Sequence, residues 1–168
     1  ILLAFSLIPQ GVYPSFSALS PKALKAKGIR LVLADLDNTL VPYQVSEPTQ
    51  ELFDWKKQLN DNGITLFLLS NSRKPTRPGD FAGKLGIPFI GHAGKPKRKG
   101  YLAAMERMGC TPEQTVMVGD QIFTDTLGAN GCGVRPILVK AIDNHNFWLK
   151  ARHVLEMPFI LLARKRRM

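Results

Sequence analysis

The chain has 168 residues, 45% of them hydrophobic, which suits one α/β domain with a sizeable core. Its two cysteines, Cys110 and Cys132, have no CxxC spacing, which argues against a disulfide framework or zinc site and fits a reducing compartment. The net charge of +10, from 23 Lys and Arg against 13 Asp and Glu, favours anionic partners such as phosphates, acidic lipids or nucleic acid, or serves solubility alone.

Residues 1–19 are expected to form a lead-in segment that packs on the domain or contacts a surface. Within it, Ile1–Ile8 is apolar but too short to span a bilayer, and it suits either the end of a removed signal or an interfacial anchor. Ser20 and Pro21 then predict the start of a short helix through Lys27, with Ser20 as its N-cap.

A buried strand of a parallel sheet is predicted over Ile29–Ala34, because this run is mostly apolar and β-branched. Asp35 and Asp37 follow at its carboxyl end, where open α/β sheets bind ligands. Two carboxylates this close repel each other unless a cation or a shared proton offsets their charge, and Mg²⁺ prefers such oxygens. The pattern therefore predicts a ligand or metal site at this strand end.

The next predicted elements are a helix over Thr49–Asn60 and an apolar strand over Ile64–Leu69. Trp55 lies on the apolar stripe of the helix, so it is interpreted as core rather than as a ligand-stacking residue. The strand ends in a polar turn, where the hydroxyl of Ser70 and the backbone N–H of Asn71 are candidate hydrogen-bond donors to an anion.

A basic, proline-containing segment over Arg73–Gly79 predicts a solvated loop. Because it directly follows the polar turn, Arg73 and Lys74 are candidates for a rim that binds part of a ligand. After a short helix, a third strand is predicted over Ile87–Ile90, and Pro88 within it indicates a sheet edge or a strand start.

Lys95 suits either of two interpretations. It is a buried cation that balances carboxylates, or an exposed member of the basic run Lys95–Lys99. A helix over Tyr101–Met108 and a fourth strand over Thr115–Val118 follow.

The fourth strand ends in a glycine followed by Asp120 and, five residues later, Asp125, and a fifth strand is predicted over Val134–Val139. Residues 144–168 predict an amphipathic basic helix that is interrupted near Pro158. This helix suits contact with an anionic membrane surface, or packing on the domain with a frayed basic tail.

Four motifs thus follow apolar segments in order, and they resemble the four motifs of the haloacid dehalogenase (HAD) superfamily. They begin at residues 35, 70, 95 and 120. Asp35-Leu36-Asp37-Asn38-Thr39 resembles motif I, DxDxT, and Ser70 after its strand resembles motif II. Lys95-Pro96 resembles motif III, and the segment from Gly119 to Asp125 resembles the GDxxxxD form of motif IV. The combination is most similar to the YqeG-type subfamily IIIA phosphatases, a group similar to the phosphatidylglycerophosphate phosphatases of mitochondria and plastids. The resemblance implies a Rossmann-like three-layer α/β sandwich over residues 20–143, with a mostly parallel sheet and no cap domain.

The resemblance also implies the roles of site residues. Asp35 would be the nucleophile that forms an aspartyl-phosphate, and Asp37 the general acid and base. Ser70, Asn71 and Lys95 would hold the phosphoryl oxygens, with Arg73 and Lys74 beside the substrate. Mg²⁺ would be held by carboxylates of this set and by the main-chain carbonyl of Asp37; the expected metal residues are Asp35, Asp37, Asp120 and Asp125.

The short connections between the motifs leave no room for a cap, so the expected substrate is a phosphate monoester presented by something large. Phosphatidylglycerophosphate is the favoured substrate. The protein is expected to be cytoplasmic and to contact the membrane peripherally. The alternatives are a protein or nucleic-acid-end phosphatase, or a catalytically idle HAD domain that binds RNA or ribosomes. The complete catalytic set argues against the idle domain, and nucleic acid is the less favoured partner.

Overall fold

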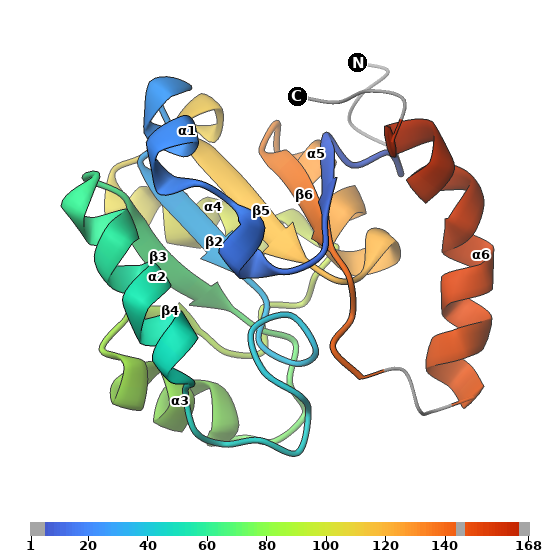
Figure 1. Cartoon of the computed structure of the whole chain (residues 1–168), viewed down its shortest axis with the longest axis horizontal. Helices are drawn as coiled ribbons and strands as arrows, with labels where there is room; N and C mark the ends of the chain where they lie inside the picture. The colour runs from blue at the N-terminus through green and yellow to red at the C-terminus, as the bar shows by residue number, and fades with distance from the viewer. Residues whose placement is uncertain (1–5, 144–146, 165–168) are drawn as a thin grey trace.

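The computed structural model describes residues 6–143 and 147–164 (Figure 1). Within these residues, six parallel strands form one sheet in the order β1-β6-β5-β2-β3-β4. The strands are β1 (Gly11–Tyr13), β2 (Leu31–Ala34), β3 (Thr65–Leu69), β4 (Phe89–Ile90), β5 (Thr115–Gly119) and β6 (Arg135–Val139). The predicted parallel α/β sheet is confirmed, and β4, which follows Pro88, is an edge strand as expected.

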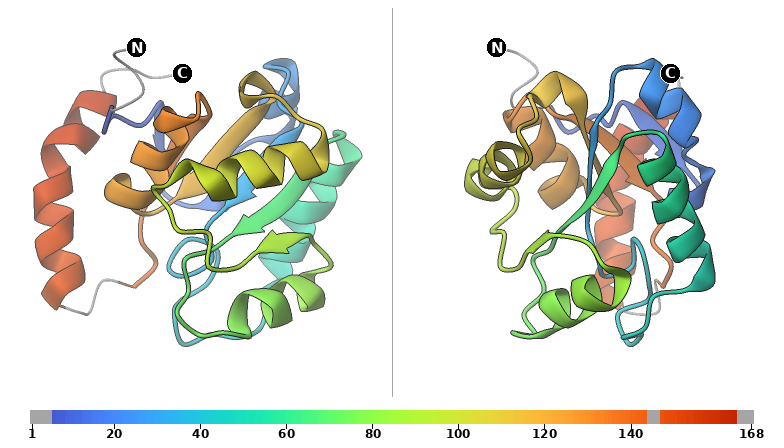
Figure 2. Two further views of the ribbon diagram at one scale, coloured as in Figure 1. Left: turned by 180° about the vertical axis from the view of Figure 1, so that it is seen from behind. Right: turned by 90° about the vertical axis from the view of Figure 1, so that its left-hand side faces the viewer.

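Helices cover both faces of the sheet and one of its edges (Figure 2). One face is packed by α1 (Pro21–Ala26), α2 (Gln50–Asp61) and α3 (Arg77–Leu85), and the other by α4 (Arg98–Met108) and α5 (Leu127–Gly131). The long α6 (Phe147–Arg164) lies along the β1 edge; the short turns are η1 (Phe16–Ala18), η2 (Pro112–Gln114) and η3 (Ile122–Thr126). This is the three-layer sandwich that the sequence predicted.

The alternation of side chains along β2 explains why its strand is apolar on both faces. Val32 and Ala34 belong to the core beneath α2, whereas Leu31 and Leu33 belong to the core beneath α4. All four are fully buried, as a central parallel strand requires. Trp55 of α2 lies in the first core and is 3% exposed, which confirms that it is a core residue.

The N-terminal region contains a strand that the sequence analysis did not predict. Gly11–Tyr13 pairs in parallel with Ile137–Val139 of β6, and Phe16 and Leu19 lie in the core beyond it. Three residues are too few to show a strand period, so β6 rather than the local pattern determines this strand. The cap predicted at Ser20 is confirmed, since its Oγ accepts a hydrogen bond from the N–H of Ala23 at 3.3 Å.

Two expectations about helices were wrong. The predicted solvated loop over Arg73–Gly79 ends early, because α3 begins at Arg77 and both Arg77 and Pro78 are buried. The C-terminal helix is not interrupted, because α6 continues through Pro158. A proline removes one N–H donor, and the packing of Ile160 and Ala163 beyond it supports the helix there. The basic residues 165–167 lie outside the described residues.

The connections next to the sheet's carboxyl edge are short. Between β2 and β3 the chain has a loop and α2, and between β3 and β4 a loop and α3. Neither of these described connections contains a cap domain. No helix within residues 6–143 and 147–164 is both long and apolar enough to cross a membrane.

Candidate active site

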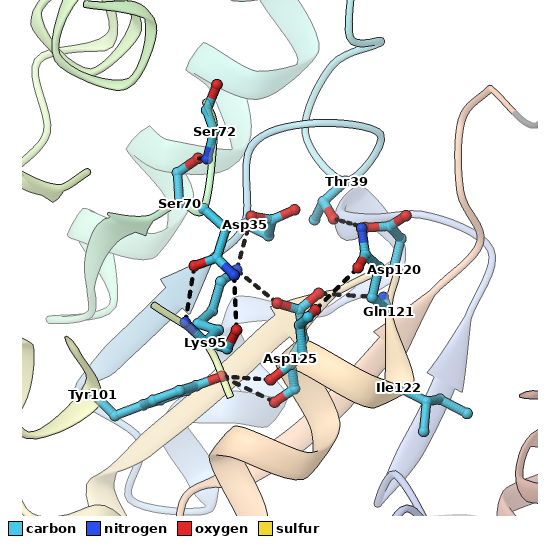
Figure 3. Close-up of polar contacts among 12 residues, drawn as sticks. Asp35, Thr39, Ser70, Ser72, Lys95, Tyr101, Asp120, Gln121, Ile122 and Asp125 are labelled. Carbon is cyan, nitrogen blue, oxygen red and sulfur yellow. Dashed lines mark hydrogen bonds and ion pairs between the residues drawn. The ribbon is translucent and has the colours of Figure 1, made fainter. Parts of the chain in front are cut away.

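Two adjacent strand ends bring the acidic residues together (Figure 3). β2 and β5 pair in parallel with Ala34 opposite Val118, and the N–H of Asp35 donates to the Val118 carbonyl at 3.0 Å. Carboxylate oxygens of Asp35, Asp120 and Asp125 all lie within 4.8 Å of one another, and all three side chains are buried. The pairing of β2 with β5 therefore places Asp35 and Asp120 side by side, because parallel strands end at the same edge of the sheet.

Lys95 is the cation at the centre of this cluster. Its Nζ donates to Oδ1 of Asp35 at 2.8 Å and to Oδ1 of Asp125 at 2.6 Å, and its side chain is 1% exposed. Burial by itself would lower the pKa of Lys95, but the negative charges of Asp125 and Asp35 outweigh it and raise that pKa. Of the two interpretations of Lys95, the buried cation is the one that the structure shows.

The backbone of Lys95 is held by the predicted polar turn. The side chain of Asn71 accepts from the N–H of Lys95 and donates to its carbonyl, each at 2.9 Å. Asn71 thus positions Lys95 and also lines the cavity in front of it. The hydroxyl of Ser70 is fully buried and accepts a hydrogen bond from the N–H of Ser72 at 3.0 Å, and it is Ser72 that lines the cavity.

The charge balance of the acids favours a further cation. Burial, together with the charges of Asp35 and Asp125, raises the pKa of Asp120 well above its ordinary value. Burial also raises the pKa of Asp125 to about 6, although Lys95 opposes the shift. Thr39 donates to Oδ1 of Asp120 at 3.0 Å, and Oδ2 of Asp120 is buried without a hydrogen-bond partner among the described residues. This donor set fits a hard divalent ion.

Asp37 is held apart from the three clustered carboxylates by Arg77. The Arg77 guanidinium donates to Oδ1 of Asp37 at 2.8 Å and to the carbonyls of Val45 and Pro42 at 2.7 Å and 3.3 Å. It therefore ties the loop after β2 to the start of α3. Burial raises the pKa of Asp37 despite the opposing hydrogen bond and charge of Arg77.

Arg77 is a site residue that the sequence analysis missed. It lies in a basic segment whose composition is typical of a solvated loop, and its position soon after the second motif is the one local signal for it. Its partner Asp37 lies 40 residues earlier in the chain. The carboxylate of Asp37 is not in the three-acid cluster. The metal role expected of its main-chain carbonyl stays a prediction.

Two small features fix the loop that carries Asp125. The hydroxyl of Tyr101 donates to the carbonyls of Thr124 and Asp125 at 3.2 Å and 3.1 Å. A Cβ at Gly119 would lie 2.1 Å from Oδ2 of Asp125, so only glycine leaves room for this carboxylate.

The site opens into a cavity of about 520 Å³. Asp35, Asp37 and Lys95 line its base, and the exposed Tyr43 and Arg73 line its rim. The predicted rim residue Lys74 does not line the cavity; its exposed ammonium lies 4.5 Å from the centre of the Tyr43 ring.

Comparison with known proteins agrees with this geometry. The chain is 32% identical over 160 residues to "Probable phosphatase YqeG" of Bacillus subtilis (strain 168), covering 95% of this chain and 92% of that protein. The chain belongs to the YqeG family of HAD-superfamily phosphatases. A family model described as HAD-hydrolase-like matches residues 92–146.

Other relatives share parts of this resemblance. The chain is 28% identical over 152 residues to "Phosphatidylglycerophosphate phosphatase 1, chloroplastic/mitochondrial" of Arabidopsis thaliana, covering 85% of this chain and 43% of that protein. This YqeG-family chain thus spans less than half of the plant protein. Among solved structures, the cobalt-bound deoxy-D-mannose-octulosonate 8-phosphate phosphatase of Haemophilus influenzae matches with a TM-score of 0.55 at 20% identity, covering 84% of this chain and 93% of that chain. That likeness supports the HAD fold.

Proposed function

We propose that this phosphatase is a Mg²⁺-dependent phosphomonoesterase that acts through an aspartyl-phosphate, with phosphatidylglycerophosphate as its substrate. The observation that carries the chemistry is the buried ammonium of Lys95 between Asp35 and Asp125 at the base of an open cavity. A cation there neutralises the nucleophile and an incoming phosphoryl group, which would otherwise repel each other.

The residues have the following roles in the proposed reaction. An oxygen of Asp35 attacks phosphorus and forms a covalent O–P bond, while the bond to the leaving alcohol breaks. Asp37, whose pKa is raised by burial, gives a proton to that alcohol. In the second step Asp37 takes a proton from water, whose oxygen attacks phosphorus, releasing inorganic phosphate and free Asp35.

The proposed metal site draws on a cluster of three buried acids. Asp35 and Asp120, with the main-chain carbonyl of Asp37, would hold Mg²⁺, and Asp125 would support this shell while it pairs with Lys95. The ion, when bound, screens the negative charge and orients the phosphoryl group.

The substrate assignment is supported by three features. Two relatives that align over 85% and 80% of this chain are phosphatidylglycerophosphate phosphatases by name, from Arabidopsis thaliana and Chlamydomonas reinhardtii. No cap closes the described site, so the phosphate can be presented by a large molecule. Arg73 and Lys74 are exposed near the cavity mouth, where they would attract an anionic headgroup.

The outer face of α6 supports presentation of the substrate at a membrane. Four of its apolar side chains are 50–68% exposed and lie on the side opposite the buried Ile160 and Ala163: Val154, Leu155, Leu161 and Leu162. The exposed cations Lys150 and Arg164 flank this face. An apolar helix face with basic flanks fits an anionic lipid surface.

The first experiment measures Mg²⁺-dependent phosphate release from phosphatidylglycerophosphate in mixed micelles. We expect release far above that from a soluble sugar phosphate, and loss of turnover in Asp35→Asn. Asp54→Asn, at an exposed position of α2, is the matched control and should keep full activity. Turnover retained in Asp35→Asn would refute the nucleophile assignment.

The substrate and the chemistry can fail separately. Release from an aryl phosphate but not from the lipid would keep the phosphatase and discard the lipid in favour of a protein or nucleic-acid-end substrate. No turnover of either, with salt-sensitive RNA binding, would favour an idle binding domain.

The membrane contact is tested by flotation with vesicles that contain or lack anionic lipid. We expect binding that needs anionic lipid and is weakened in Leu161→Ser/Leu162→Ser. Leu102→Ser is the control, because Leu102 lies on α4 and its exposed fraction of 45% is similar to that of the two α6 leucines. Equal binding to both kinds of vesicle, or no binding, would contradict the proposed contact.

A further inference from the structure

The C-terminal helix α6 contacts the buried acid cluster at Asp120, which does not line the cavity in front of Asp35 and Lys95. Ile160 of α6 packs with Leu138 and with Ile122, which follows the metal ligand Asp120 by two residues. A second cavity, of about 380 Å³, lies between α6 and the ends of β1 and β6 and is lined by Asp120 and by α6 residues. The helix therefore packs directly behind the loop that carries Asp120.

Two charged residues of α6 face this loop. The Nη2 of Arg152 lies 3.6 Å from Oδ2 of Asp120, and the Nε of Arg152 lies 3.8 Å from Oε1 of Glu156. Oε1 of Glu156 accepts a hydrogen bond from the backbone N–H of Ile122 at 3.0 Å, and Glu156 is 2% exposed. Glu156 thus anchors the backbone of the loop, and Arg152 lies between Glu156 and Asp120.

Two buried atoms at this contact lack a hydrogen-bond partner among the described residues, and each lies near an opposite charge: Oδ2 of Asp120 near Nη2 of Arg152, and Nε of Arg152 near Glu156. Burying a charged group in this way is costly unless an opposite charge is close. Thr39 already holds the other carboxylate oxygen of Asp120, so Arg152 supplies the second constraint on its orientation.

We propose that Arg152 is a positioning residue that orients the Asp120 carboxylate for the metal, and that Glu156 holds Arg152 and the metal loop in place. On this proposal α6 is part of the active site as well as a surface helix. The inference rests on the proposed metal-dependent function. Partners that orient a ligand are expected to affect metal affinity about 10- to 100-fold.

The test measures the Mg²⁺ concentration that gives half-maximal thermal stabilisation of the whole chain. We expect Arg152→Gln to raise this concentration about tenfold, as loss of a ligand-orienting partner does. Arg152→Lys, which keeps the charge, should recover part of the loss. Arg30→Gln is the matched control, since it removes an exposed arginine that precedes β2, at the amino end of the strand and away from the acids, and it should behave as wild type.

The dependence of kcat on Mg²⁺ concentration is a second measurement, and a merely structural role of Arg152 would not change it. In Arg152→Gln, saturating Mg²⁺ should restore most of kcat, because the acids themselves are intact. If Arg152→Gln does not fold, Glu156→Gln tests the same contact: it keeps a side-chain oxygen for the Ile122 N–H but loses the charge that faces Arg152, and it should weaken Mg²⁺ binding to a smaller extent.

The failures are distinguishable. Wild-type Mg²⁺ affinity or tighter binding in Arg152→Gln would overturn the positioning role while leaving the proposed function intact. Absence of any Mg²⁺ stabilisation in the wild-type chain would overturn both.

Discussion

Gly119→Ala is expected to disrupt the active site through a single added methyl group. The new Cβ would lie 2.1 Å from Oδ2 and 2.3 Å from Cγ of Asp125, whereas ordinary contacts begin at 3.4 Å. The carboxylate must therefore move by about 1.3 Å from the new Cβ, which disturbs its contacts with Lys95 at 2.6 Å and with the N–H of Gln121 at 3.2 Å. Gly119 belongs to a fully buried strand, so its neighbours have little room to relax.

The size of the effect follows from these contacts. Overpacking a core costs about 1–3 kcal/mol. Weakening of the Lys95–Asp125 pair adds to this, so we take about 3 kcal/mol as the loss of folding free energy, within the range for a damaged buried ion pair. For a chain of this size that corresponds to a fall in Tm of about 6–12 °C. Phosphatase activity should fall with it, because Lys95 loses a partner that fixes its position.

Calorimetry or circular dichroism melting, together with phosphate release, measures the two effects. Gly83→Ala is the matched control: Gly83 is exposed in α3, and a Cβ there meets nothing within 4 Å. This control should be neutral or more stable by up to about 1 kcal/mol, because alanine favours a helix. A Gly119→Ala variant with the Tm and activity of the wild type would refute the steric reasoning.

Three further predictions follow from the contacts of the site. Arg77→Gln should lower kcat about 10- to 100-fold by freeing Asp37, which is part of the roughly 10²- to 10⁴-fold that general acid–base catalysis contributes. The alkaline limb of its pH–rate profile should move to higher pH, because the charge that lowers the pKa of Asp37 is lost. An unmoved limb would count against this. Tyr101→Phe should cost about 1–3 kcal/mol in urea unfolding, because the carbonyls of Thr124 and Asp125 lose their donor; an unchanged urea midpoint would contradict it. In EDTA the chain should lose stability as pH rises from about 4 to about 6, because the pKa of Asp125 is raised to about 6 in the folded state. The folded state therefore binds this proton more tightly than the unfolded state does, and it loses that advantage as the proton leaves. Mg²⁺ should abolish this loss and raise Tm, and scans of Tm against pH with and without Mg²⁺ check both.

The sequence by itself determined the sheet and the positions of the acids. Apolar runs that end in polar residues identify buried parallel strands, and each motif follows such a run: Asp35 after β2, Ser70 after β3 and Asp120 after β5. Because the carboxyl ends of parallel strands share one edge, local pattern places these residues at that edge, and the resemblance of the four motifs assigned them to one site. Trp55 was placed in the core for the same reason, since periodicity records which face of a helix is buried.

Only the tertiary structure decided which charged side chains meet. Arg77 lies in a basic segment with the composition of a solvated loop, and its burial depends on Asp37, which is 40 residues distant. Arg152 lies on a helix whose pattern suits a surface element, and it contacts Asp120 because α6 packs along the β1 edge. The strand over Gly11–Tyr13 likewise exists because β6 presents an unpaired edge to it. Such pairings depend on how distant segments are placed in space, whereas local sequence patterns record only what each segment buries.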